Sequence, residues 1–225
     1  MTDNLEPAGW RPILLVATAA VLILAGVQTV ALSTAPTIDA SGADVARWLV
    51  AHRDAVRWSV WATTAGVVAY SVMIALLRQT LPPVYRDLYL MGGLTAVITG
   101  AVQAWLWAAL SLRAEETPPV VVRAVLDVAI YWGPLLTGAM ITMIAPVTLL
   151  ALRRAAGLPR WLGLFGAVVV GEQGVETVTI FSSSGFTAPG GPMNMQLGAA
   201  LVITWTLAFS LCRAFARRDA LGHVT

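Results

Sequence analysis

The sequence predicts an all-α fold: a polytopic transmembrane bundle of six helices, with both chain termini in the cytoplasm and a short amphipathic helix on the outer surface. Three observations lead to this prediction. Of the 225 residues, 58% are hydrophobic and only 12% are charged, a composition well outside the range of soluble globular proteins. Six apolar runs reach the roughly 20 residues that a membrane-spanning helix needs. The arginines also divide unequally between the loops, and such a bias orients helices in a membrane.

The six apolar runs form a single transmembrane domain over residues 1–225. They lie at about residues 12–32, 57–77, 88–112, 124–152, 161–181 and 193–215. By its position, the first run could be a cleaved signal peptide. However, it follows Asp3 and Glu6 and lacks a basic stretch before it, so we expect a retained helix.

Two local patterns indicate how the predicted helices bend and pack. Gly133 and Pro134 interrupt the overlong fourth run. Because a proline deletes one backbone hydrogen bond, we expect a kink there. In the fifth run, small residues recur every four positions at Gly163, Ala167 and Gly171. This stripe predicts a close approach by a neighbouring helix.

The orientation follows from the fourteen arginines, since the chain has no lysine. With the amino terminus inside, nine of them are cytoplasmic: Arg11, Arg78, Arg86, Arg153, Arg154, Arg160, Arg213, Arg217 and Arg218. The other five are balanced by five acidic residues in the same outer segments: Arg47, Arg53, Arg57, Arg113 and Arg123 with Asp39, Asp44, Asp54, Glu115 and Glu116. An even number of spans then returns the carboxyl terminus to the cytoplasm.

The first outer loop predicts a short helix at about residues 42–55. Ser41 and Asp44 have the spacing of a capping box, which marks the start of a helix. Apolar side chains follow at helical spacing, including Val45, Trp48 and Leu49. We expect this helix to lie flat on the outer surface, with its charged face in water and Trp48 dipped inward.

Several chemistries are excluded by the residues that the chain lacks. Without lysine there is no Schiff-base nitrogen. The two histidines, His52 and His223, lie outside the apolar runs, so an intramembrane haem or histidine-rich metal site cannot form. The single Cys212 cannot form an internal disulfide. No phosphate-binding, dinucleotide-binding or nucleophile-elbow motif is present, and a net charge of +2 is too small for a nucleic-acid partner. We therefore expect no cofactor and no metal.

Three acidic residues inside the apolar runs are the strongest functional signal. Asp127 lies in the fourth run, and Glu172 and Glu176 lie in the fifth. A charge inside a bilayer costs at least a few kcal/mol, so such residues face protein or water. Glu172 and Glu176 are one helical turn apart and share a face. The count of residues from the outer boundary places Asp127 at a similar depth, so we expect the three acids to meet across the bundle.

Other polar residues fall at comparable depths. Arg123 and Tyr131 share the helical face of Asp127, while Gln28, Gln103 and Gln173 lie on other runs. Two hypotheses follow. In the first, Arg123 neutralises Asp127 or Glu176 and the amides satisfy the rest, so that the cluster fixes the register of the helices. In the second, the acids line an outward-facing pocket in which at least one carboxyl is protonated and can donate its proton.

Tryptophans concentrate in the outer half of the predicted bundle, at Trp58, Trp61, Trp105, Trp107 and Trp132. They indicate either an interfacial aromatic belt or an aromatic pocket that would stabilise cationic intermediates. For the pocket, the predicted substrate-binding residues are Arg123, Tyr131, Trp132, Gln103, Gln173, Trp58, Trp61 and Trp105.

The layout of the chain resembles an uncharacterised six-helix bacterial family of integral membrane proteins, a domain of unknown function. The resemblance rests on the Arg57-Trp58 pair that opens the second run and on the turn Gly157-Leu158-Pro159-Arg160-Trp161-Leu162-Gly163. It implies the six-helix topology and a place in the bacterial cell (inner) membrane, and no activity. In its size and buried acids, the chain is also similar in kind to small integral membrane terpene cyclases. Neither Glu172 nor Glu176 follows a tryptophan, so no catalytic residue is carried over.

These observations favour a membrane-embedded enzyme, a lyase or isomerase of terpene-cyclase type. In this hypothesis Glu176, Glu172 or Asp127 is the general acid, and the substrate is a lipophilic, isoprenoid-like molecule. The alternatives are a small proton-coupled transporter, a lipophile-binding membrane protein or a structural membrane subunit. The expected partners are the lipid bilayer and the lipophilic small molecule, and a homo-oligomer is compatible with the sequence.

Overall fold

The computed structural model describes residues 9–131 and 133–216, and all regular structure within them is helical. The helices are α1 (Trp10–Ala31), α2 (Gly42–Ala51), α3 (Arg53–Arg78), α4 (Pro83–Leu112), α5 (Pro119–Ile130), α6 (Gly133–Leu152), α7 (Arg160–Glu176) and α8 (Ala199–Ala214). A short 3-10 segment, η1 (Thr177–Phe181), follows α7, and a π-helical segment, η2 (Met193–Gly198), leads into α8. The predicted all-α class is confirmed for this part of the chain.

Within residues 9–131 and 133–216, five helical stretches are long and apolar enough to cross a membrane: Trp10–Ala31, Arg53–Arg78, Pro83–Leu112, Arg160–Phe181 and Met193–Ala214. A shorter apolar helix covers Leu136–Leu152. These helices are those of a multi-pass membrane protein. The predicted continuous helix over 124–152 is wrong, because the chain forms two helices that are separated after Ile130. Pro134 has no N–H to donate to the carbonyl of Ile130, which favours the interruption.

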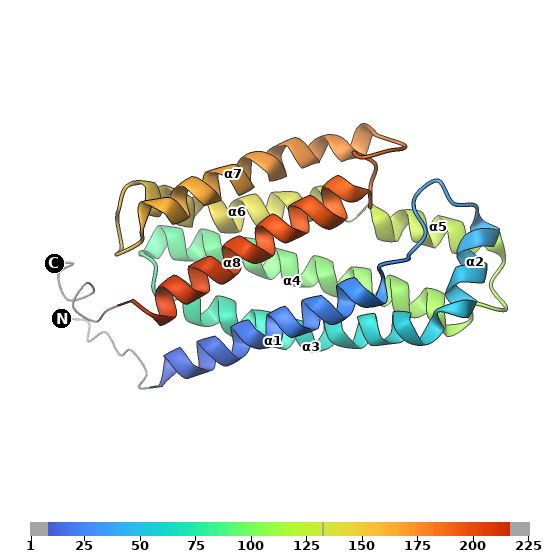
Figure 1. Cartoon of the computed structure of the whole chain (residues 1–225), viewed down its shortest axis with the longest axis horizontal. Coiled ribbons are helices and arrows are strands. Elements are labelled where there is room, and N and C mark those ends of the chain that lie inside the picture. Colours follow the sequence, from blue (N-terminus) through green and yellow to red (C-terminus); the bar gives the residue numbers. More distant parts are fainter. Residues whose placement is uncertain (1–8, 132, 217–225) are drawn as a thin grey trace.

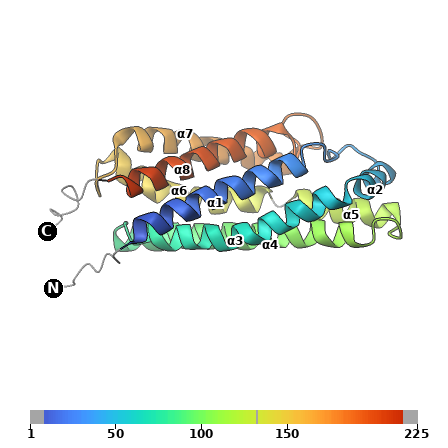
Figure 2. The same ribbon diagram turned by 60° about the horizontal axis from the view of Figure 1, so that its bottom comes forward.

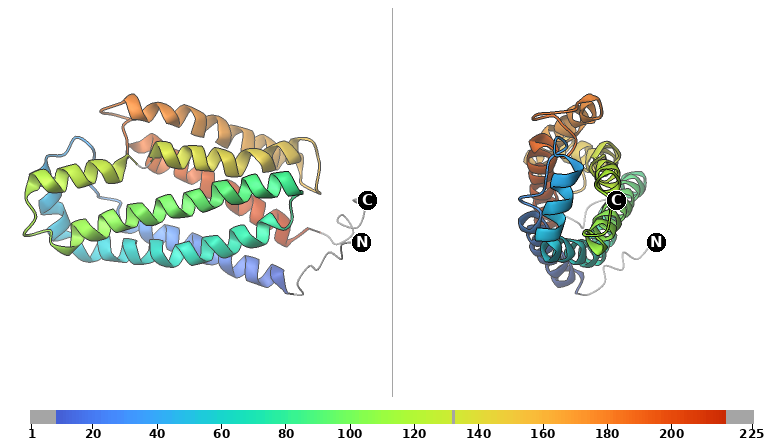
Figure 3. Two further views of the ribbon diagram at one scale, coloured as in Figure 1. Left: turned by 180° about the vertical axis from the view of Figure 1, so that it is seen from behind. Right: turned by 90° about the vertical axis from the view of Figure 1, so that its right-hand side faces the viewer.

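Six of the helices form a closed ring around the long axis of the molecule. Each packs against the next in the order α1, α3, α4, α6, α7 and α8, and α8 returns to α1 (Figures 1 and 2). The two remaining helices, α2 and α5, pack on each other at one end (Figure 3). The α2–α5 pair therefore extends the bundle at the end far from Trp10 and Ala214.

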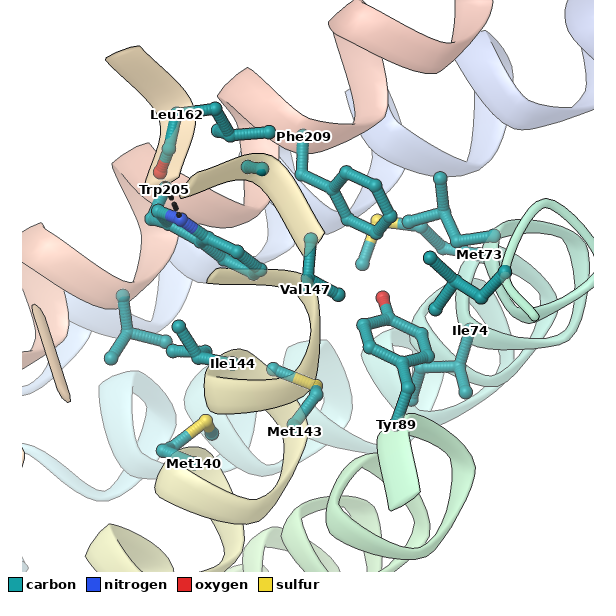
Figure 4. Packing of buried hydrophobic residues seen from close by; sticks show 14 of the residues in the cluster. Met73, Ile74, Tyr89, Met140, Met143, Ile144, Val147, Leu162, Trp205 and Phe209 are labelled. Atoms are coloured by element: carbon teal, nitrogen blue, oxygen red, sulfur yellow. Dashed lines mark hydrogen bonds between the residues drawn. The ribbon is translucent and has the colours of Figure 1, made fainter. Parts of the chain in front are cut away.

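The main hydrophobic core fills the half of the ring nearest the ends of the described chain. Trp205 and Phe209 of α8 lie at its centre, and Tyr89 of α4 meets Phe209 edge-on with ring centroids 5.7 Å apart (Figure 4). The indole Nε1 of Trp205 donates to the carbonyl of Leu162 on α7 at 3.3 Å. The buried indole is therefore both packed and hydrogen-bonded, which joins α8 firmly to α7.

The close contact between α6 and α7 depends on two glycines. A Cβ atom on Gly163 would lie 2.6 Å from the backbone nitrogen of Leu152, and one on Gly166 would overlap Thr148. Gly171 faces open space. The predicted small-residue stripe is thus correct at Gly163 and wrong at Gly171, because the helices cross along positions that are three residues apart.

The outer amphipathic helix is shorter than predicted. Ser41 caps α2, accepting from the amide of Asp44 at 3.1 Å, as the capping box indicated. The helix ends at Ala51, and α3 begins at Arg53, four residues before the predicted span. The backbone of His52 leaves the helical region, with φ −117° and ψ 21°, so the predicted range of 42–55 is corrected to Gly42–Ala51.

The opposite end of the ring is held by a buried arginine. Arg213 of α8 donates to the carbonyl of Ala156 at 2.7 Å and to that of Thr80 at 3.1 Å. Arg11 of α1 donates to the carbonyl of Ala216 at 2.9 Å. The start of α1 and the end of α8 therefore lie at the same end of the bundle (Figure 1), as an even number of membrane crossings requires. The orientation of that end toward the cytoplasm stays a prediction.

Candidate functional site: a central cavity beside a carboxyl cluster

A cavity of about 250 Å³ lies between the helices of the ring and is partly open to the surroundings. Most of its wall is apolar, with Leu22, Met73, Met140 and Val202 contributed by four different helices. Its polar lining includes Gln28, Gln103, Gln173, Glu176, Asn194 and Thr206. The cavity thus combines an apolar wall with a group of amides and one carboxyl, an arrangement typical of small-molecule sites.

The polar residues gather around Glu176, the last residue of α7. Its side chain is only 2% exposed. One carboxyl oxygen accepts from the Gln173 amide at 2.7 Å, and the other accepts from the Asn194 amide. The same Gln173 nitrogen donates to Glu172 at 2.9 Å. Glu172, Gln173, Glu176 and Asn194 are called the carboxyl cluster below.

Two elements of the chain bring this cluster together. Glu172 and Glu176 are one turn apart on α7, so both carboxyl groups reach the amide of Gln173. The segment that faces them is η2, which contains Asn194. It is π-helical, and such turns are frequent at functional sites. A Cβ atom on Gly198 would lie 2.5 Å from the Glu176 Oε2 atom and 3.1 Å from the Gln173 Nε2 atom. Only glycine at this position lets η2 approach the carboxyl groups so closely.

The cluster contains no counter-ion from the described residues. The ion pairs between described residues are Arg47–Asp44, Arg53–Glu115, Arg57–Asp54, Arg86–Asp87 and Arg123–Asp127. None includes Glu172 or Glu176. An unpaired carboxylate in such a place is strongly disfavoured. The cluster can therefore hold a proton or bind a cation.

Asp127 belongs to a different part of the molecule. Its carboxylate pairs with Arg123 at 2.7 Å, and Arg123 also donates to the carbonyls of Ala40, at 2.6 Å, and Ile38. This pair fastens the loop before α2 to α5. The expected meeting of Asp127 with Glu172 and Glu176 is corrected, because no contact between described residues joins them. The depth estimate assumed a continuous fourth helix, and the interruption after Ile130 places α5 at the end of the bundle.

The tryptophans predicted to form a pocket face outward. Trp58 and Trp61 are 59% and 55% exposed and contact each other, and Trp105 is 69% exposed. Trp107 is buried against Trp48. These positions match an interfacial belt, so the proposed aromatic pocket of Trp58, Trp61 and Trp105 is wrong.

The remaining predicted site residues divide between the cavity and the end of the bundle formed by α2 and α5. Gln103 and Gln173 line the cavity together with Glu176. Tyr131 is 43% exposed at the end of α5, while Trp132 lies outside the described residues. Among the described residues, the aromatic residue on the cavity wall is Tyr70.

Sequence analysis missed the contribution of η2. Asn194 is the second residue of the last apolar run and comes two positions after the sequence Gly190-Gly191-Pro192. An amide at the start of a membrane-spanning run was the available signal. Its partner could not be identified, because the pairing depends on how the uncharged loop returns the chain toward Glu176.

The chain matches no family model, no curated protein and no solved structure in the three comparisons made. The function therefore has to be inferred from the geometry of the cavity and of the carboxyl cluster.

Proposed function

We propose that this multi-pass membrane protein binds a small lipophilic molecule inside the ring of helices, with the carboxyl cluster holding the polar end of that molecule. The observation that carries this proposal is the cavity, whose wall is mostly apolar and includes the carboxyl group of Glu176 and the amide of Asn194. Such a site suits a molecule that partitions into the bilayer and carries one polar group.

The volume of the cavity limits the size of the ligand. An apolar cavity of about 150 Å³ in another protein holds benzene. In proportion, the cavity of about 250 Å³ accommodates roughly ten non-hydrogen atoms. A small amphiphile fits this space.

A second candidate function is acid catalysis on an isoprenoid-like substrate, as in a lyase or isomerase. The observation that favours it is the carboxyl group of Glu176, which faces an apolar cavity large enough for a ten-carbon skeleton. A carbocation intermediate would meet Tyr70 but none of the outward-facing tryptophans. Ligand binding therefore ranks first, and catalysis or proton-coupled transport would build on the same site.

We further propose that α6 is the sixth membrane span and that the protein resides in a bacterial inner membrane with both termini in the cytoplasm. The bias of the arginines and the resemblance at residues 157–163 support this placement. Reporter fusions test it. A reporter within 153–160 should be cytoplasmic, and a reporter within 182–192 should be external. Exchanged signals would contradict the topology.

A cavity-filling substitution tests the binding function. Gly100 of α4 lines the cavity, and a Cβ atom there would meet nothing within 4 Å. Gly100→Leu should fill the space without displacing the backbone. Gly138→Leu on α6 is the matched control, because Gly138 also has open space around it but lies outside the cavity lining.

The measurement is the thermal stabilisation of the detergent-purified protein by propylbenzene, which has about the permitted size. Wild type and Gly138→Leu should be stabilised, and Gly100→Leu should not. Equal stabilisation of all three proteins would show that the ligand acts elsewhere. For catalysis, Glu176→Gln keeps the shape but cannot deliver a proton as a carboxylic acid does, so it should lose about 10² to 10⁴ in rate. Mass spectrometry of lipid extracts from expressing cells measures the product.

A further inference from the structure

We infer that the ligand of the cavity is a lipophilic primary amine, bound as an ammonium ion by the carboxyl cluster. This inference rests on the proposed binding function of the same cavity and specifies the chemical class of the ligand. Three observations lead to it: the unused hydrogen-bonding atoms of the cluster, its uncompensated charge, and the apolar wall beyond it.

The first observation is that the buried atoms of the cluster that lack a partner are acceptors. The Gln173 Nε2 group donates to both Glu172 and Glu176, and this uses its two hydrogens. The side chain of Asn194 is 93% buried, since its exposed fraction is 7%, and its amide nitrogen already donates to Glu176. The buried atoms without a partner are the Asn194 Oδ1 and Glu172 Oε1 atoms. A matching ligand must therefore donate hydrogen bonds.

The second observation concerns charge. Glu172 and Glu176 are joined by the same amide and have no ion-pair partner among the described residues. A cationic donor would satisfy the open acceptors and neutralise negative charge at the same time. An ammonium group has three N–H donors and no acceptor, and, like the lysine side chain, it stays ionised at neutral pH. Hydrogen bonds of this charged kind are about twice as strong as neutral ones.

The third observation distinguishes an organic cation from a bare metal ion. Within the described residues, no group of three or more His, Cys, Asp or Glu side chains could hold a metal. The cavity wall also includes apolar side chains such as Val21, Leu22 and Met140. An ammonium ion with a hydrocarbon body would fill this space as well as pair with the acids, whereas a hydrated inorganic ion would leave the apolar wall unused.

The experiment compares probes of one shape and size with different polar ends. The probes are 2-phenylethylamine, 2-phenylethanol, phenylacetate and propylbenzene, each of roughly ten non-hydrogen atoms as the cavity allows. Calorimetric titration of the full-length protein in detergent, with sodium chloride fixed, gives their dissociation constants. The amine should bind about tenfold more tightly than the alcohol, and phenylacetate should not bind.

Substitutions in the carboxyl cluster test whether it causes the preference for the amine. The double variant Glu172→Gln and Glu176→Gln should lose the preference for the amine and still bind propylbenzene. Glu115→Gln is the matched control, because Glu115 is exposed and pairs with Arg53 away from the cavity, and it should behave as wild type. Retention of propylbenzene binding also shows that the double variant is folded.

Three results would overturn the inference and can be told apart. If the alcohol binds as tightly as the amine, and both fail to bind Gly100→Leu, the cavity binds lipophiles but the acids hold a proton instead of a cation. If no probe binds, or if Gly100→Leu binds all of them unchanged, the binding function itself is wrong. Loss of the amine preference in Glu115→Gln would equally contradict the role of the cluster.

Discussion

Substitution of Gly198 by alanine tests the geometry of the carboxyl cluster most directly. Gly198 has ordinary helical dihedral angles, φ −60° and ψ −47°, so alanine adds no backbone strain. Its new Cβ atom would lie 2.5 Å from the Glu176 Oε2 atom, whereas ordinary contacts begin at 3.4 Å. The carboxyl oxygen must therefore move by about 0.9 Å, the difference between these distances.

This displacement breaks hydrogen bonds in the cluster. The bond between Gln173 and Glu176 is 2.7 Å long, and a movement of that size away from the amide takes it beyond hydrogen-bonding distance. A buried group that loses its partner costs about 1–3 kcal/mol. Alanine gains up to about 1 kcal/mol over glycine within a helix. We therefore expect Gly198→Ala to lower the free energy of unfolding by up to about 2 kcal/mol.

Gly174→Ala is the matched control. Gly174 lies on α7 within the same turn as the cluster, but a Cβ atom there would meet nothing within 4 Å. Gly174→Ala should stabilise the protein by up to about 1 kcal/mol, so the free energies of unfolding of the two variants should differ by about 1–3 kcal/mol. Equilibrium unfolding in mixed detergent micelles, followed by circular dichroism, gives both values. If both alanine variants are equally stable, the close approach of η2 to the carboxyl groups is refuted.

Two further predictions concern the end of the bundle formed by α2 and α5. Arg123→Leu should destabilise the protein by up to about 3 kcal/mol. The double variant Arg123→Leu with Asp127→Leu should be less destabilised, because a lone charge costs more than an absent pair. A double-mutant cycle measures this coupling, and additive effects would contradict the pairing. The hydrogen bond from Ser41, followed by that from Arg47, lowers the pKa of Asp44 below its usual 3.8. The resulting stabilisation is present above the unfolded pKa and is lost as the pH falls through the lower folded value. Ser41→Ala should raise the pKa of Asp44, as measured by nuclear magnetic resonance, and an unchanged pKa would contradict the role of the cap.

The sequence predicted most of the membrane-spanning helices because their length and apolar composition are local properties. Helix interruption was only partly predictable. The kink at Pro134 was expected, but a complete break after Ile130 depends on how α5 packs against α2. That packing is a tertiary effect, which no local pattern contains.

The candidate site was predictable on one helix and not on its partner. The spacing of Glu172 and Glu176 placed both carboxyl groups on one helical face, and the structure shows both bonded to Gln173. The amide of Asn194 could not be assigned, because η2 is a π-helical segment and a count in steps of 3.6 residues gives the wrong face there. Asp127 was misplaced because its depth was counted along one continuous helix, whereas the chain forms two helices there, α5 and α6.

The closure of the ring by α8 has a consequence for biogenesis. A chain enters the membrane from its amino terminus as it is synthesised, and α8, which packs between α1 and α7, is the last described helix to emerge. Until then, the flank of α1 that α8 will cover stays open to lipid, and Glu176 lacks the amide of Asn194. Insertion of α8 therefore creates the cavity and completes the carboxyl cluster in one late event. A nascent chain halted before Asn194 would hold its two acids in an unfinished site.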